Sequence, residues 1–167
     1  NNTTFQRLNN DVPVDVHDTM AFKYKESINS VIYFALLPYR LNDSAVKKRF
    51  LELKSFNGKE YYKIEVTFQE AGGGVDFEDV YVYWINSDTY FVDYLAYSFK
   101  VNGGGLRFRK AFNERFVGDI RFVDYINYKP VAEVASVAEL DKLFLNDQLK
   151  ELSKIELKNI SVSSPTF

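Results

Sequence analysis

Cysteine is absent from this chain of 167 residues, which excludes disulfide bonds, thiolate nucleophiles and thiolate metal sites. Histidine occurs once, at His17, so neither a Ser-His-Asp triad nor a multi-histidine metal site can be assembled. The longest apolar run, Val31–Leu37, is far shorter than the roughly 20 residues of a membrane-spanning helix. We therefore interpret the chain as non-enzymatic, and we expect no cofactor and no resident metal.

An excess of charge of one sign is also lacking, because 21 basic and 23 acidic residues give a net charge of −2. This balance provides no general attraction for nucleic acid or for an anionic membrane surface. Arg107 and Arg109 do alternate with phenylalanines, and basic and aromatic side chains on one sheet face can bind single-stranded nucleic acid. Alternation along a strand places the two kinds on opposite faces, so we expect no nucleic-acid partner.

Aromatic residues are abundant at 17% of the chain, and most lie in alternating segments typical of strands. A helix is predicted from around Asp18, with an apolar part at Glu26–Leu37 that Pro38 ends and that we expect to be buried. Further helical turns are predicted at Asp43–Lys48 and within Val137–Leu152. The predicted strands are Phe50–Phe56, Lys59–Phe68, Glu78–Asn86, Thr89–Lys100, Leu106–Asn113, Asp119–Tyr128 and Ile155–Val162.

Two glycine triplets, Gly72–Gly74 and Gly103–Gly105, stand about one hairpin apart. In an antiparallel meander, alternate connections lie at the same end of the sheet, so both triplets are predicted on one rim. Tight turns at Asn57-Gly58, Ser87-Asp88 and Val117-Gly118 are predicted on the opposite rim. The glycine-rich rim comprises Gly72, Gly73, Gly74, Asp76, Glu78, Gly103, Gly104, Gly105 and Arg107.

Acidic residues allow two interpretations at two places. Asp76, Glu78 and Asp79 could supply oxygen ligands to Ca²⁺, but the spacing favours pairing with Arg107 or Arg109 across strands. Asp93 and Asp124 lie in mid-strand among apolar residues. Such a pair could serve hydrolysis, although a mid-strand acid is more typical of a hydrogen bond to Tyr or Arg.

The strands around Trp84 are apolar on both faces, which requires cover on both sides of the sheet. We predict a single domain over residues 1–167, of α+β class. Its expected architecture is a strongly curved antiparallel β-sheet with helices on the concave side.

Four segments carry a family resemblance: SINSVIYFALLPYRLND, NGKEYYKIEVTF, GGGVDFEDVYVYWINSDTYFVDYLAY and GGGLRFRKAFNERFVGDIRFVDYINYK. The sequence resembles an uncharacterised family of Gram-negative, Bacteroidota-type cell-envelope lipoproteins related to the LolA/LolB lipoprotein-carrier fold. The likeness covers about Phe5 to Val162 and implies a half-barrel with an apolar hollow. The family normally begins with a signal peptide, a lipid-bearing cysteine, a helix and several strands that are not in this chain. The resemblance thus implies a periplasmic protein, anchored to the outer membrane through that lipidated cysteine.

The resemblance implies a non-catalytic protein that binds a lipid, or the acyl chain of a lipoprotein, in the hollow. The expected lining is Ile28, Val31, Ile32, Phe34, Trp84, Tyr94 and Phe108. The alternative is a protein-interaction module that uses the glycine-rich rim, with the hollow filled by its own helices. Whether Val31–Leu37 plugs the sheet would discriminate between the two.

Overall fold

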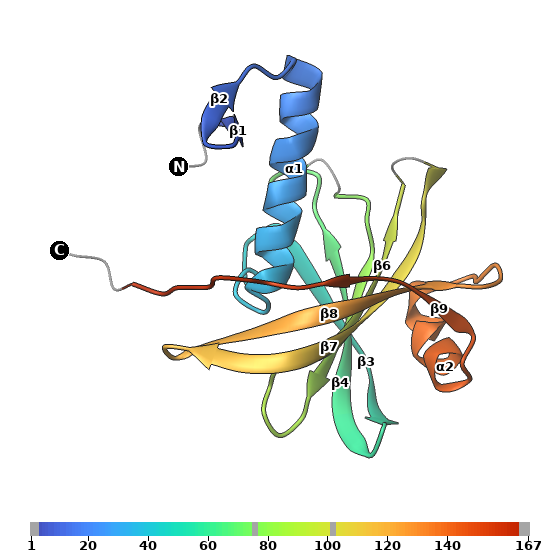
Figure 1. Ribbon diagram of the computed structural model, residues 1–167. Coiled ribbons are helices and arrows are strands. Elements are labelled where there is room, and N and C mark those ends of the chain that lie inside the picture. The colour runs from blue at the N-terminus through green and yellow to red at the C-terminus, as the bar shows by residue number, and fades with distance from the viewer. Residues whose placement is uncertain (1–3, 75–76, 101–102, 164–167) are drawn as a thin grey trace. The chain divides into compact units, whose positions relative to one another are not determined.

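The computed structural model describes residues 4–74, 77–100 and 103–163 (Figure 1). The chain divides into two compact units, Asn1–Arg40 and Leu41–Phe167. The interpretation of the whole chain as one domain stays a prediction. Among the described residues, no helix combines the length and the apolar character that crossing a membrane requires.

The first unit contains a hairpin and a helix: β1 (Arg7–Asn9), β2 (Val12–Val14) and α1 (Asp18–Ala35). The hairpin was not predicted from the sequence, and its turn uses Asn10 and Asp11, both at positive φ. The helix begins at Asp18, as predicted, and ends before Pro38. His17 is exposed and caps it, since its Nδ1 accepts a hydrogen bond from the Thr19 backbone N–H at 3.4 Å.

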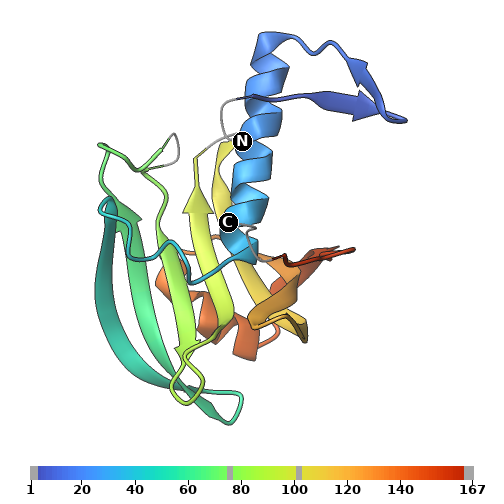
Figure 2. The same ribbon diagram turned by 90° about the vertical axis from the view of Figure 1, so that its left-hand side faces the viewer.

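The second unit is built on one antiparallel sheet with strands in sequence order, confirming the α+β class and the meander (Figure 2). Its elements are β3 (Val46–Phe56), β4 (Lys59–Phe68), β5 (Tyr81–Asn86), β6 (Val92–Phe99), β7 (Gly105–Val117), β8 (Ile120–Pro130), the 3-10 turn η2 (Val137–Glu139), α2 (Leu140–Leu145) and β9 (Leu149–Ile155). The predicted Asn57-Gly58 hairpin is confirmed, with both residues at positive φ.

Two sequence predictions are wrong. The helix predicted at Asp43–Lys48 is absent, because β3 already begins at Val46 and pairs there with Phe68 of β4. The strand predicted at Ile155–Val162 is displaced, because β9 ends at Ile155. It pairs on one side only, so it needs no alternating apolar pattern and its mostly exposed residues do not show one.

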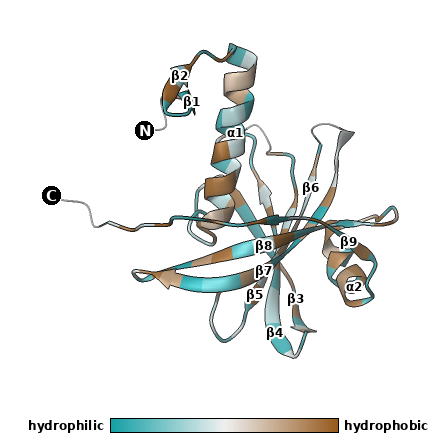
Figure 3. Ribbon diagram, viewed as in Figure 1, coloured by the Kyte–Doolittle hydropathy of each residue, from teal (hydrophilic) through white to brown (hydrophobic). Residues whose placement is uncertain are grey.

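The hydrophobic core lies where η2 and α2 cover one face of the sheet. Figure 3 shows the hydrophobic character of α2, in contrast to the hydrophilic residues along β4 and β7. The core cluster comprises Phe56, Tyr61, Val82, Trp84, Tyr94, Ala96, Phe108, Val137 and Leu140. On the opposite face of β4, β5 and β6, Val66, Tyr83 and Leu95 are also fully buried. The expectation that the central strands are covered on both faces is therefore confirmed.

Candidate functional site

The residues expected to line an apolar hollow fall into two groups. Trp84, Tyr94 and Phe108 come together in the core of the second unit, with exposed fractions of 0%, 6% and 0%. Phe144 of α2 packs on this cluster, with its ring centroid 4.9 Å from that of Phe108 and 6.1 Å from that of Tyr94. The space over Tyr94 and Phe108 is thus occupied by the chain's own helix.

The other expected lining residues lie on α1, in the first unit. Ile28, Val31 and Ile32 are each about half exposed, and only Phe34 is buried. This differs from the fully buried helix predicted for Glu26–Leu37. Because Ile28, Val31 and Ile32 follow one another at helical spacing, they form an apolar stripe along α1.

The two glycine triplets connect β4 to β5 and β6 to β7, so the meander brings them to one end of the sheet. A side chain at Gly74 or Gly103 would meet no heavy atom within 4 Å, although both residues have positive φ. Glu78 pairs with Lys100 at 2.8 Å, and the Arg107 guanidinium lies 4.7 Å from the Phe99 ring centroid. Asp76 lies outside the described residues.

A pocket of about 300 Å³ opens at the end of the sheet that carries the tight turns. Its lining comes from the Asn57-Gly58 turn and from the neighbouring parts of β4, β6, β7 and β8. The lining residues are Asn57, Lys59, Tyr61, Asp93, Tyr94, Ala111, Phe112, Asn113, Glu114, Arg121 and Val123. Only Tyr94 among them belongs to the lining expected from the sequence.

Two irregularities in strand pairing place polar side chains in this pocket. In β6, Asp93 is the extra residue of a bulge, since Val92 and Tyr94 pair with adjacent residues of β5. In β7, Asn113 and Glu114 fall between paired positions, opposite the unpaired Val123 of β8. A bulge turns side chains away from the regular alternation. All four residues left out of the two ladders line the same pocket.

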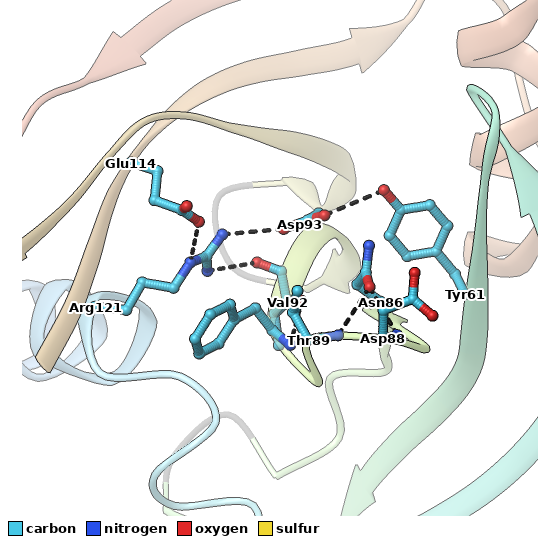
Figure 4. A network of polar contacts seen from close by, with 9 residues as sticks. Tyr61, Asn86, Asp88, Thr89, Val92, Asp93, Glu114 and Arg121 are labelled. Atoms are coloured by element: carbon cyan, nitrogen blue, oxygen red, sulfur yellow. Dashed lines mark hydrogen bonds and ion pairs between the residues drawn. The ribbon is translucent and has the colours of Figure 1, made fainter.

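Arg121 of β8 holds the bulged acids together, as Figure 4 shows. Its Nη2 lies 3.0 Å from Oδ1 of Asp93, and its Nε donates to Glu114. Its Nη1 donates to the Val92 carbonyl at 3.2 Å. The guanidinium also lies 4.6 Å from the ring centroid of Phe91. These contacts join β8 to β6 and β7, so Arg121 fixes both bulges relative to one another.

Two tyrosine side chains, Tyr61 and Tyr94, also line the pocket beside these charged groups. Tyr61 donates a hydrogen bond to Oδ2 of Asp93 at 3.1 Å, and Tyr94 accepts one from the side-chain amide of Asn57 at 3.1 Å. Burial raises the pKa of Tyr61, and the negative charge of Asp93 raises it further. Burial also raises the pKa of Tyr94. Both hydroxyls therefore stay protonated and neutral at physiological pH.

Asp124 supports the pocket from behind the β7 bulge. It accepts hydrogen bonds from Asn113 at 2.7 Å, from Arg115 at 3.0 Å and from the Leu157 backbone N–H at 2.9 Å. Burial alone would raise the pKa of this carboxyl, but the three donors together hold it below its ordinary value. Asn113 has a positive φ of 50°, a conformation that asparagine tolerates better than most residues.

The arrangement provides donors and acceptors rather than an exposed nucleophile. Both mid-strand acids, Asp93 and Asp124, are hydrogen-bonded to Tyr or Arg, as expected from the sequence. Within the described ranges, no group of three or more acidic or histidine side chains could hold a metal ion. The pocket lining therefore combines neutral hydrogen-bond donors and acceptors with paired charges.

Sequence reasoning missed this pocket because the bulges depend on pairing between strands. One local signal was present: Asn113 and Glu114 interrupt a strand of alternating apolar residues. Asparagine in a mid-strand position is typical of a local departure from extended backbone. Asp93 gave a similar signal among apolar neighbours, but its contact with Arg121 spans 28 residues.

Comparison with known proteins identifies the family. Residues 1–157 match the model described as "Family of unknown function (DUF6503)". Nothing matches this chain among the curated proteins or among the solved structures. The match extends over nearly the whole chain, and it shows no link to the LolA/LolB carriers. The chain belongs to DUF6503, a family of unknown function.

Proposed function

We propose that this protein is a non-catalytic binding protein whose ligand is a small polar molecule held in the pocket of the second unit. One observation carries the proposal: the residues that two separate bulges exclude from strand pairing all line one pocket. Bulges weaken a ladder locally, and they are over-represented beside functional sites.

The chemistry of the lining supports a binding role over a catalytic one. Asp93 and Arg121 neutralise each other, and the hydroxyls of Tyr61 and Tyr94 are held by hydrogen bonds. A small number of fixed polar groups beside apolar side chains is typical of a ligand site. Phe112 and Val123 supply the apolar part.

The experiment is a screen of small polar molecules against the uniformly ¹⁵N-labelled chain by two-dimensional ¹H–¹⁵N NMR. Binding should shift the backbone amide signals of Asp93, Asn113 and Glu114, which belong to the bulges. The amides of Gly74 and Gly103, at the other end of the sheet, serve as the internal control. If the compounds shift the control signals, or if no compound shifts any signal, the result would argue against this site.

An apolar ligand is a second candidate, supported by the half-exposed Ile28, Val31 and Ile32 of α1. In this proposal the sheet is a curved half-barrel of the LolA type, and the ligand is a lipid or a lipoprotein acyl chain. Adding a fatty acid to the same NMR samples tests it, because signals of α1 rather than of the bulges would shift. Shifts confined to the glycine-rich rim on addition of a protein would support the interaction module instead.

The cellular place of the protein is also a proposal. The resemblance to cell-envelope lipoproteins supports a periplasmic location with attachment to the outer membrane through a lipidated cysteine outside this chain. Fractionation of cells that express the natural protein tests the proposal. Recovery with the cytoplasmic fraction would contradict it.

A further inference from the structure

Three of the four charged side chains that line the pocket, Asp93, Glu114 and Arg121, are paired with one another. Arg121 contacts Asp93, Glu114 and the Val92 carbonyl through three of its N–H groups. A charged ligand would compete with these internal contacts, and breaking them costs free energy. Lys59, the remaining charged residue, is exposed to solvent, and with it the two basic and two acidic residues of the lining carry no net charge. The pocket therefore favours an uncharged ligand.

The neutral groups of the lining retain unused hydrogen-bonding capacity within the part of the chain that the structure describes. Tyr94 accepts a bond from Asn57, so its own hydroxyl proton can be donated to a ligand. Asn57 and Asn113 each donate one N–H to the protein, which leaves a second N–H and a carbonyl oxygen on each amide. The carboxylates of Asp93 and Glu114 can accept further bonds beside Arg121.

Donors and acceptors are thus interleaved around the pocket. A hydroxyl group donates and accepts at the same time, so a ligand with several hydroxyls can use both kinds. Phe112 adds a half-buried aromatic ring, and Val123 adds a buried apolar side chain. A sugar ring combines these features, because its hydroxyls project from the edge and its C–H groups form apolar faces.

We propose that the pocket binds a neutral saccharide of one or two rings. This inference rests on the proposed function and names its ligand class. The volume of about 300 Å³ is at the small end of the range for ligand pockets, which suits a mono- or disaccharide. The ring of Phe112 packs against the sugar face, while Asn57, Asn113 and Asp93 bond its hydroxyls.

The test is an NMR titration of the ¹⁵N-labelled chain with glucose, galactose, mannose, N-acetylglucosamine and their disaccharides. Glucuronate and glucosamine, which add one charge to the same ring, are the matched charged probes. A neutral sugar should shift the side-chain amide signals of Asn57 and Asn113, with the Asn127 amide of β8 as control. Its affinity should exceed that of the charged probes by about tenfold, since the lining carries no net charge to attract either probe.

Two variants test whether the sugar contacts the Phe112 ring in the pocket. Phe112→Ala should weaken binding of the neutral sugar by about tenfold. Phe116→Ala, on the same strand but exposed and outside the lining, should leave it unchanged. Equal effects of both variants on the measured affinity would overturn the inference.

The outcomes distinguish the inference from the proposed function. Shifts of the Asn57 and Asn113 signals with the charged probes, but with no neutral sugar, would overturn the saccharide as ligand and keep the binding pocket. Shifts with neutral sugars that map away from the pocket would overturn the site. The absence of shifts with every probe, in the unaltered protein, would overturn both.

Discussion

A buried ion pair joins α2 to the sheet, and its removal should destabilise the protein strongly. Nζ of Lys63 in β4 lies 2.9 Å from Oδ2 of Asp141 in α2, and 3.1 Å from Oε1 of Glu52 in β3. The side chains of Lys63 and Asp141 are 4% and 0% exposed. The substitution Asp141→Asn leaves the buried ammonium without its buried partner, while the shape of the site is kept.

Breaking one side of a buried pair costs about 3–5 kcal/mol, because the remaining charge stays in a poorly solvated site. Glu52 is half exposed and compensates only in part. The loss is large against a total stability of about 5–15 kcal/mol for a domain. Replacing both partners, as in Lys63→Met with Asp141→Leu, should recover most of the loss, since no charge is then buried.

Urea unfolding measures the free energy of unfolding of Asp141→Asn, of the single variants Lys63→Met and Asp141→Leu, and of the double variant. Trp84 is the only tryptophan and is fully buried, and its ring centroid lies 5.5 Å from Nζ of Lys63. Its fluorescence therefore reports on this region. The control is Glu65→Gln. This variant breaks a salt bridge to Arg49 that has a similar length, 2.9 Å, but whose arginine side chain is 69% exposed. The loss of unfolding free energy should be less than about 1 kcal/mol.

Two results would refute the reasoning. If Asp141→Asn costs no more than Glu65→Gln, the pair does not hold α2 on the sheet. If the double variant loses as much unfolding free energy as the two single variants lose in sum, the loss arises from missing hydrogen bonds and not from an uncompensated buried charge. Either result would also weaken the view that α2 is a fixed part of the core.

Three further predictions concern the core and the pocket. The depressed pKa of Asp124 stabilises the fold fully above about pH 4, and this contribution is lost as the pH falls through that pKa. Asp124→Asn should therefore flatten the acid limb of stability in urea unfolding at several pH values, and an unchanged slope would contradict this assignment. Tyr61→Phe should cost about 1 kcal/mol by removing the bond to Asp93, measured by the same unfolding method. Phe144→Ala should reduce the free energy of unfolding by about 2–3 kcal/mol, because it opens the space over Phe108. The loss is smaller than for a fully buried ring, since Phe144 is only half-buried. An unchanged stability would show that α2 packs loosely.

The sheet was predictable because its signals are local. Asn57-Gly58 requires two residues at positive φ, which identifies a tight hairpin without knowledge of the rest of the chain. Apolar residues on both faces of the strands around Trp84 indicated burial on both sides of the sheet. The order of the strands followed from the short connections between them. The hairpin at Asn10 and Asp11 was missed because its strands have only three residues each, all of them exposed.

The pocket was not predictable, because its parts meet only through pairing. Glu114 and Arg121 belong to adjacent strands, but Asp93 reaches Arg121 only when β6 and β8 lie on either side of β7. Position along a strand could not show that Asn113 leaves the ladder. The same limit applies to β9, whose exposed residues carry no apolar pattern and whose place is fixed by β8.

The abundance of aromatic residues has a structural explanation in the second unit. Phe144 of α2 contacts four rings of the sheet at once, with centroid distances of 4.9 to 6.1 Å to Phe56, Tyr94, Phe108 and Tyr128. A ligand over Tyr94 and Phe108 would have to displace this ring, and the buried pair of Lys63 and Asp141 opposes any movement of α2. The pocket at the bulges needs no such displacement, since its polar groups are already fixed by Arg121. For the second unit, binding at the end of the sheet is therefore favoured over binding within its core.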